Sequence, residues 1–232
     1  MIGHISCDGC TYSGHPHNED CPEASHNKYP DRSFSKHKYY DLHSLMKEMS
    51  ALNFEELMKL LNDHRKLMAT AMGSSKNHQA WEGGYLAHIV ECLNIAVWLY
   101  DTSPRRLPFA RCHALEVLFL HDLEKPFKQF PDAGTPIGSW AQLEPLSHYN
   151  QGGVQINLNS KQFRKEFRNQ LIRKYGIQLS DAQWNALAYV EGVPDSEYSP
   201  GERTMGELAA FCHCCDILSA RLWYDEGKTG AW

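Results

Sequence analysis

The sequence lacks a long hydrophobic run, an excess of basic residues and an internal repeat. No segment approaches the roughly 20 apolar residues that a membrane-spanning helix needs, and no opening apolar run resembles a signal peptide. The formal net charge of -5 argues against a protein that coats nucleic acid by bulk electrostatics, whereas a small phosphorylated ligand fits it better. We therefore expect a soluble, cytoplasmic protein with no membrane partner.

Eight cysteines raise the question of disulfides. Cys212, Cys214 and Cys215 crowd one expected helical turn, and Cys92 and Cys112 lie in apolar segments of helical periodicity. Reduced thiols are therefore the expected state. The 232 residues are enough for one sizeable core, and we expect one domain with an appendage.

Residues 1–40 are rich in Cys, His, Pro, Ser and Asn and show no lasting periodicity, so they are expected to form an irregular arm. The arm contains a C-x2-C-x4-H-x5-C spacing, near that of a small zinc knuckle that binds tetrahedral zinc. The candidate ligands of this structural zinc are Cys7, Cys10, His15 or His17, and Cys21. His4 and His26 are further candidates. The alternative is a tail whose thiols and imidazoles bind nothing.

Residues 41–232 are expected to form an all-α domain, because their apolar residues recur at helical spacing. Asn53, with Glu56 in a capping box, and Ser160 and Ser180 are the predicted N-caps. The segment from Pro108 to Phe119 is apolar almost all round, which predicts a central buried helix. The expected helices cover residues from about 42 to 49, 54 to 72, 84 to 103, 108 to 119, 160 to 174, 181 to 190 and 204 to 224.

Between residues 126 and 159, prolines and glycines predict a long loop, with brief strand pairing around 154–158. A loop of this length beside a site is typical of a lid or a substrate wall. The helix that follows Ser160 carries many Lys and Arg residues. We interpret them as a solvated face, since most charge runs on helices have no further role.

Three of the expected helices carry residues that suit one divalent cation: His88, the pair His121-Asp122, and Asp216. Imidazole and carboxylate ligands favour Mn2+, Fe2+, Co2+, Ni2+ or Zn2+. Such a cation lowers the pKa of its bound water toward neutrality, and this water can then attack phosphorus. The alternative, that both imidazoles are ordinary core histidines, is weakened by their combination with two carboxylates.

The runs NHQAWEGGYLAH (77–88), FLHDLEKP (119–126) and CDILSA (215–220) resemble, in order and spacing, the motifs of the HD-domain metal-dependent phosphohydrolase superfamily. The resemblance spans about residues 43 to 224 and implies an HD-domain-like helical bundle. It implies that His88, His121, Asp122 and Asp216 are the metal ligands. It also places His78 at the site and makes Lys125 the basic residue that follows the HD pair.

Further site residues are expected around this centre. His148 is the candidate general acid, with His78 as its competitor. Lys125 and Lys128, with Arg111 nearby, are candidates for binding phosphate. Trp81 could stack on a base, although buried aromatic residues are more often core.

The sequence departs from the superfamily members that bind two metals, which carry extra histidines before the last Asp. His148, in SHYNQGG (147–153), could supply one of them, but Glu191 stands in the place of the histidine pair. We therefore favour one metal, and a second metal held by His148 and Glu191 is the alternative. Glu191 could otherwise contact the substrate.

The resemblance implies an enzyme that cleaves a phosphate ester or anhydride of a nucleotide, a (d)NMP or a dNTP, by attack of metal-bound water. One alternative is a phosphodiesterase or exonuclease, in which the arm and the basic helix bind a nucleic acid strand. Another is a non-catalytic regulatory module that binds a nucleotide. A homodimer is also considered, because helical domains of this kind often pair.

Overall fold

The computed structural model describes residues 38–74, 78–146, 160–193, 201 and 203–222, and the backbone of 6–7 and 10–11. The chain divides into two units, Met1–Tyr39 and Tyr40–Trp232. In the first unit, β1 (Ser6–Cys7) pairs antiparallel with β2 (Cys10–Thr11), with Cys7 opposite Cys10. The side chains of the predicted zinc ligands Cys7, Cys10, His15 and Cys21 lie outside the described residues, so the zinc knuckle stays a prediction.

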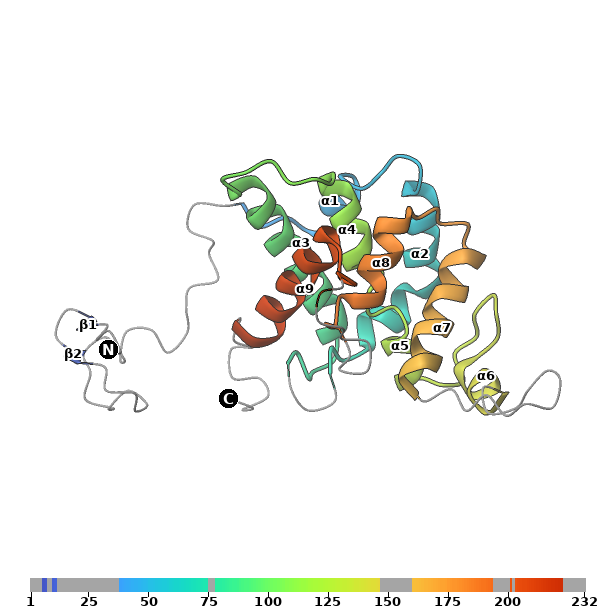
Figure 1. The fold of residues 1–232 in the computed structure, drawn as a ribbon. Helices are drawn as coiled ribbons and strands as arrows, with labels where there is room; N and C mark the ends of the chain where they lie inside the picture. The colour runs from blue at the N-terminus through green and yellow to red at the C-terminus, as the bar shows by residue number, and fades with distance from the viewer. Residues whose placement is uncertain are drawn as a thin grey trace. The chain divides into compact units, whose positions relative to one another are not determined.

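The described part of the second unit is helical (Figure 1), which confirms the predicted all-α class. No helix in the described ranges is long and apolar enough to cross a membrane. The helices are α1 (Leu42–Met46), α2 (Phe54–Thr70), α3 (Gly84–Thr102), α4 (Arg111–Leu120), α5 (Lys125–Gln129), α6 (Trp140–Leu146), α7 (Ser160–Lys174), α8 (Asp181–Tyr189), α9 (Glu207–Ile217) and the π-helix η2 (Leu218–Leu222).

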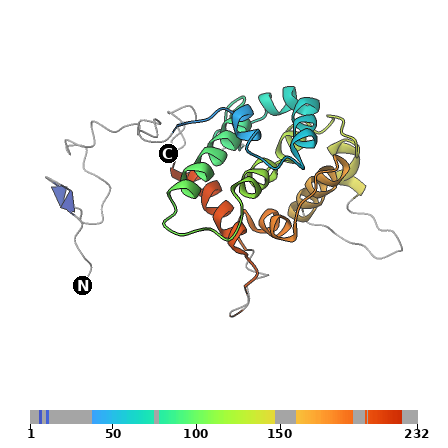
Figure 2. The same ribbon diagram turned by 90° about the horizontal axis from the view of Figure 1, so that it is seen from above.

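Helix α3 lies at the centre of this unit, in contact with α2, α4, α9 and η2. Figure 2 shows the same bundle from above, with α9 alongside α3. Helix α4 is buried from Ala114 to Leu120, as predicted for the apolar segment. Because α3 and α4 are apolar around most of their circumference, they bury their polar exceptions together with their apolar residues. Polar residues within α3 and at the end of α4 contribute to the candidate site, together with a residue of α9.

The predicted capping role of Asn53 is wrong. Its side chain makes no cap hydrogen bond to α2; instead its amide donates to the carbonyl of Gln178 at 2.9 Å and to Glu116 Oε1 at 3.2 Å. Residues distant in the sequence, and not the backbone of the first turn of α2, therefore bind the Asn53 side chain. The predicted cap at Ser180 is confirmed, since it forms a capping box with Gln183.

The predicted loop from 126 to 159 is wrong over its first half, because α5 and α6 lie within it. Pro126 is compatible with a helix because it occupies the first turn, where no backbone N–H is needed. The ring of Trp140 in α6 packs on Phe163 and Phe167 of α7, with centroids 4.7 and 5.1 Å apart. Residues 147–159, with His148 and the expected strand pairing, lie outside the described part.

Two other helix predictions need correction. The last helix, expected from 204 to 224, begins at Glu207 and changes to the π-helix η2 after Ile217. The expected solvated face of α7 is wrong at Arg168, which is buried. Its guanidinium donates to the carbonyl of His121 at 2.8 Å and to that of Leu187 at 2.9 Å. Arg168 therefore fastens the turn that follows α4 to α7 and α8.

The glycine at position 84, the first residue of α3, is explained by the backbone of Gln79. Gln79 has a left-handed φ of 45°, and its carbonyl accepts a hydrogen bond of 3.0 Å from the N–H of Gly73. A Cβ atom on Gly84 would lie 1.9 Å from this carbonyl oxygen. Only glycine at position 84 therefore lets the Gln79 segment lie against the start of α3.

We predict that Gly84→Ala destabilises the fold by about 1–3 kcal/mol or more, because the added methyl group must displace the Gln79 backbone. The matched control is Gly134→Ala, where an added Cβ meets no atom within 4 Å. Urea denaturation followed by circular dichroism measures both variants. Equal stabilities of the two variants would show that the close approach at Gly84 carries no constraint.

Candidate metal centre

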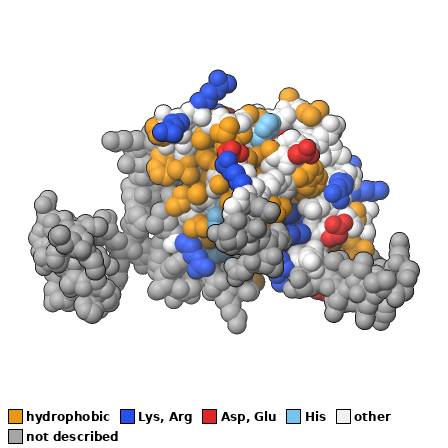
Figure 3. Space-filling model, in the orientation of Figure 1, with side chains coloured by type: hydrophobic (Ala, Val, Ile, Leu, Met, Phe, Trp, Pro, Cys, Tyr) orange, Lys and Arg blue, Asp and Glu red, His pale blue; other side chains and the backbone are white. Residues whose placement is uncertain are grey.

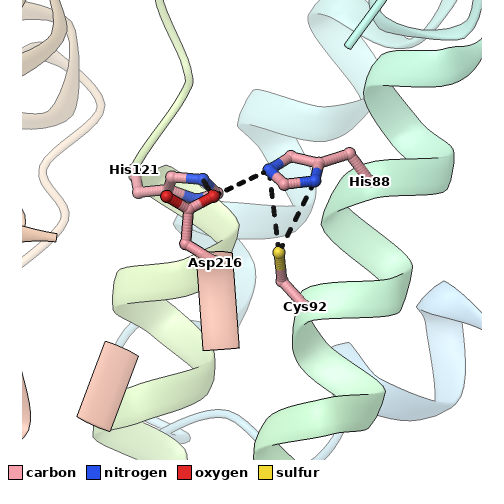
Figure 4. A group of neighbouring side chains, drawn as sticks. All are labelled: His88, Cys92, His121 and Asp216. Atoms are coloured by element: carbon pink, nitrogen blue, oxygen red, sulfur yellow. Dashed lines mark hydrogen bonds and ion pairs between the residues drawn. The ribbon is translucent and has the colours of Figure 1, made fainter. Parts of the chain in front are cut away.

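Four side chains from three helical segments face one point. His88 projects from α3, His121 and Asp122 follow α4, and Asp216 lies in α9. Figure 4 shows the imidazoles of His88 and His121 and the carboxylate of Asp216 turned toward one another. His88 Nε2 lies 3.5 Å from Asp122 Oδ2 and 3.2 Å from Asp216 Oδ1, and His121 Nε2 lies 3.2 and 3.5 Å from the same two atoms.

These separations are those expected of ligands around one small cation. Ligand atoms bound at about 2.0–2.2 Å in octahedral or tetrahedral geometry lie roughly 3.0–3.5 Å from their neighbours. All four nitrogen–oxygen distances reach from 3.2 to 3.5 Å. The side chains are therefore already spaced for a first-row transition metal, and no large movement is needed to admit one.

The proton positions on both imidazoles also suit a cation. His121 Nδ1 lies 2.7 Å from the carbonyl oxygen of Leu118, which can only accept, so Nδ1 carries the proton. His88 Nδ1 lies 3.0 Å from Ser219 Oγ, which in turn donates to Glu91 at 2.7 Å. In both rings Nε2 faces the two carboxylates, and in the neutral ring this atom carries the lone pair. Metal-binding histidines are typically anchored in this way through their other nitrogen.

Two of the facing atoms lack a hydrogen bond. Within the described part of the chain, His121 Nε2 and Asp122 Oδ2 are buried and have no hydrogen-bond partner of acceptable geometry, although Lys125 Nζ makes an ion-pair contact with Asp122. Buried polar atoms without partners are rare in folded proteins, and each one calls for an explanation such as an ion. A cation at this point would satisfy both atoms.

The electrostatics of the cluster favour a positive charge at the same place. Burial alone lowers the pKa of His121, but the carboxylates of Asp122 and Asp216 outweigh it and raise this pKa to about 10. Burial likewise raises the pKa of Asp122, yet the positive charges of His121 and Lys125 hold it well below its ordinary value. In the absence of a metal, the protonated ring of His121 would therefore supply the positive charge that the carboxylates favour.

Cys92 is a fifth polar group at this centre that the sequence analysis did not select. Together with His88, His121 and Asp216 it forms a cluster that could hold a metal ion, since their ligand atoms all lie within 4.8 Å of one another. Its sulfur lies 3.8 Å from Nδ1 and 3.7 Å from Nε2 of His88 (Figure 4). Because these distances are nearly equal, the sulfur lies against the ring and not along the Nε2 lone pair. Burial also raises the pKa of this thiol well above its ordinary value.

The cluster opens to solvent on one side. The side chains of His88, His121 and Asp122 are at most 3% exposed, whereas those of Asp216 and Lys125 are 19% and 26% exposed. Burial lowers the pKa of Lys125, but the neighbouring Asp122 outweighs it and raises the pKa. Lys125 therefore keeps its positive charge beside the opening, where an anionic ligand would arrive.

His78 lies beside the cluster, as the motif implied. Its ring centroid is 5.1 Å from that of His88, and within the described residues its Nε2 has no hydrogen-bond partner. Burial, together with His88 and Lys125, lowers the pKa of His78 to about 4. The ring is therefore neutral near pH 7 and can accept a hydrogen bond.

The other predicted site residues have different surroundings. Arg111 begins α4, about 15 Å from the His121 end of this ten-residue helix, and forms ion pairs with Asp101 and Glu48. Lys128 is exposed in the last turn of α5, and Trp81 is half-buried in the turn before α3. Glu191 is exposed, with its carboxylate 3.7 Å from Lys161 Nζ. Arg111 is thus committed to a surface ion-pair network, which speaks against its predicted role in substrate binding.

Besides Cys92, three buried polar residues around the centre were missed. Glu91 and Glu124 are each 4% exposed. Arg168 donates a hydrogen bond to the carbonyl of His121, in the turn that follows α4. Burial and the nearby Asp122 raise the pKa of Glu124 to about 7. A carboxylate within an apolar helical segment was a usable signal for Glu91. Nothing in the sequence distinguishes Arg168 from the other cations of α7.

We predict that His121→Ala lowers the number of divalent transition-metal ions bound per chain by about one, because it removes one of the facing nitrogens. The matched control is His64→Gln: this histidine is also buried, but it contacts the hydroxyl of Tyr175 at 2.9 Å and lies outside the cluster. Plasma spectrometry after equilibration with Co2+ or Mn2+ gives the stoichiometry. Identical metal contents in both variants and the wild type would remove the cluster as a metal site.

We also predict that Asp122→Asn weakens Co2+ binding at least tenfold, whereas Cys92→Ala changes it less than about threefold, since the sulfur does not lie along the lone pair of His88. Competition with a chromophoric chelator measures both affinities. A thiolate-to-cobalt absorption band in the wild type that disappears in Cys92→Ala would instead make Cys92 a ligand.

No protein-family model, curated protein or solved structure matches the chain. The ordered imidazoles, the unpartnered buried atoms and the spacing of the ligand atoms all point to the same position.

Proposed function

We propose that the chain is a metal-dependent phosphohydrolase of the HD type, acting on a nucleotide, and that His88, His121, Asp122 and Asp216 are its metal ligands. The single observation that carries the proposal is the convergence of two Nε2 atoms and two carboxylate oxygens at mutual distances of 3.2–3.5 Å. Asp122 is preferred to Cys92 because its oxygen faces both imidazoles.

A divalent cation held there would polarise a phosphoryl oxygen and lower the pKa of a coordinated water. The side chains around it supply position and charge. The buried carboxylates balance the charge of the cation, and their fixed spacing leaves the partly exposed side of the cluster, near Asp216, for the substrate. Lys125 lies on this side and would pair with a phosphate oxygen.

His78 is suited to orienting a water molecule as a hydrogen-bond acceptor, because its depressed pKa of about 4 keeps the ring neutral near pH 7, although the same low pKa makes it a weak base. The same neutrality makes His78 a poor general acid. The protonation of the leaving oxygen is therefore assigned, within this proposal, to His148, which lies outside the described residues, or to solvent. Lys125 stays protonated and serves as an electrostatic partner for the substrate.

The nucleotide part of the proposal depends on the resemblance of the motifs, with Trp81 as the candidate for stacking on a base. The strand-binding alternative gains little support from α7. Lys165 donates to the carbonyl of Ala188 at 2.8 Å, Lys161 pairs with Glu191, and Arg168 is buried. These cations already have partners within the fold, so they do not form an unengaged basic track for a nucleic acid strand.

We predict that Asp122→Ala lowers the rate of phosphate or triphosphate release from nucleotides at least 100-fold, because it removes a ligand, while the circular dichroism spectrum keeps its helical signal. The assay incubates the purified protein with Mn2+ or Co2+ and a panel of nucleoside monophosphates and deoxynucleoside triphosphates. Wild-type activity in this variant would contradict the ligand assignment. Mononucleotides released from labelled single strands, with free nucleotides left intact, would favour the exonuclease alternative.

A second prediction concerns Lys125. Lys125→Ala should raise KM for the nucleotide roughly tenfold or more, since it removes a charged partner of the phosphate beside the opening. The control is Lys128→Ala, which removes the same charge from an exposed position in the last turn of α5. A KM in Lys125→Ala equal to that of the wild type would show that Lys125 does not contact the substrate.

A further inference from the structure

Glu91 is a buried carboxylate in the middle of the most apolar helix. It lies one turn beyond His88 in α3 and is only 4% exposed. Burying a carboxylate is costly unless its oxygens accept hydrogen bonds. Its Oε2 atom accepts two, one from Ser219 Oγ and one from Gln79 Nε2, both at 2.7 Å. The turn before α3, α3 itself and the distant η2 therefore meet at this oxygen.

The direction of the hydrogen bonds in this network is fixed by its donors. The amide nitrogen of Gln79 can only donate, so Oε2 of Glu91 acts as an acceptor. Ser219 has a single hydroxyl proton, and it is directed at the same oxygen. Ser219 Oγ is then left as the acceptor for His88 Nδ1 at 3.0 Å. His88 must therefore carry its proton on Nδ1, which leaves the lone pair on Nε2.

We propose that Glu91, acting through Ser219, is a positioning residue that holds His88 in the tautomer and ring orientation needed to bind a cation. The proposal rests on the proposed function only in requiring a cation at Nε2, and it does not require that the chain hydrolyse any substrate. His121 obtains the same tautomer from the carbonyl of Leu118, within its own helix. His88 instead depends on side chains from α3 and η2.

The surroundings of Glu91 support this role. Gln79 reaches Oε2 from the left-handed turn that Gly84 makes room for, and its amide also lies 3.4 Å from the carbonyl of Ser219. Ser219 belongs to a π-helical turn that begins two residues after Asp216, and such turns are frequent at functional sites. Both a strained backbone and an irregular helix thus deliver donors to one buried oxygen. Strain of this kind persists only where the surrounding contacts hold it.

Ser219→Ala and Glu91→Gln test the proposal in the full chain. We expect each to lower the affinity for Co2+ roughly 10- to 100-fold, the range found when the hydrogen-bond partner of a metal-binding histidine is removed. The saturating stoichiometry should stay as in the wild type, because all four ligand side chains are still present. Chelator competition measures the affinity without substrate, so a failure to find hydrolysis leaves this test intact.

Glu116→Gln is the matched control. Glu116 is also a buried carboxylate, 1% exposed in α4, and it accepts hydrogen bonds from Gln183, Asn53 and Ser50. It contacts none of the four proposed ligands. Glu116→Gln should lower the thermal midpoint while leaving the Co2+ affinity within about twofold of the wild type. The proposal is overturned if Ser219→Ala and Glu91→Gln bind Co2+ as tightly as this control.

Nitrogen NMR of the histidine rings gives a readout that a purely structural role would not change. In the metal-free wild type at a pH where the ring is neutral, the nitrogen shifts of His88 should report a proton on Nδ1. In Ser219→Ala they should report a mixture of both tautomers or a proton on Nε2, while the shifts of His64 stay unchanged. A wild-type His88 with its proton on Nε2 would refute the proposal without any metal measurement.

Discussion

The structure around the candidate site depends on one electrostatic requirement, that two carboxylates and two buried imidazoles share a single point. Asp122 is buried and Asp216 is partly buried, and negative charges in such a place are tolerated only with positive partners. Lys125 offers one such partner from the open side. A divalent cation would complete the balance, which is why the site is interpreted as a metal centre.

The elements around the site are arranged to keep these side chains in place. His121 is fixed through its own helix and through Arg168, which binds its carbonyl, whereas His88 is fixed through Ser219 and Glu91. On the face seen in Figure 3, hydrophobic side chains gather over the region of α3 and α9, with Lys and Arg mostly around it. Ile217, the residue after Asp216, is 43% exposed.

The sequence predicted the helical class, most helix positions and the four converging side chains, because helical periodicity and ligand type are local properties. It failed where distant partners decide the outcome. Asn53 has the sequence signature of a cap, yet it binds Gln178 and Glu116. In the sequence Arg168 is indistinguishable from a surface cation, and only the folded chain shows its hydrogen bond to Leu187 of α8. Cys92 stands four residues after His88 and so shares its helix face, but its closeness to His121 and Asp216 depends on how α3 packs against α4 and α9.

The wide separation of the candidate ligands along the chain has a consequence for how the protein matures. His88, His121 and Asp216 come from α3, the end of α4 and α9, so a nascent chain has no complete cage until α9 has left the ribosome. An ion bound there would link segments that are independent in the unfolded state, and its binding would stabilise the folded chain. Metal supply would then affect the yield of folded molecules.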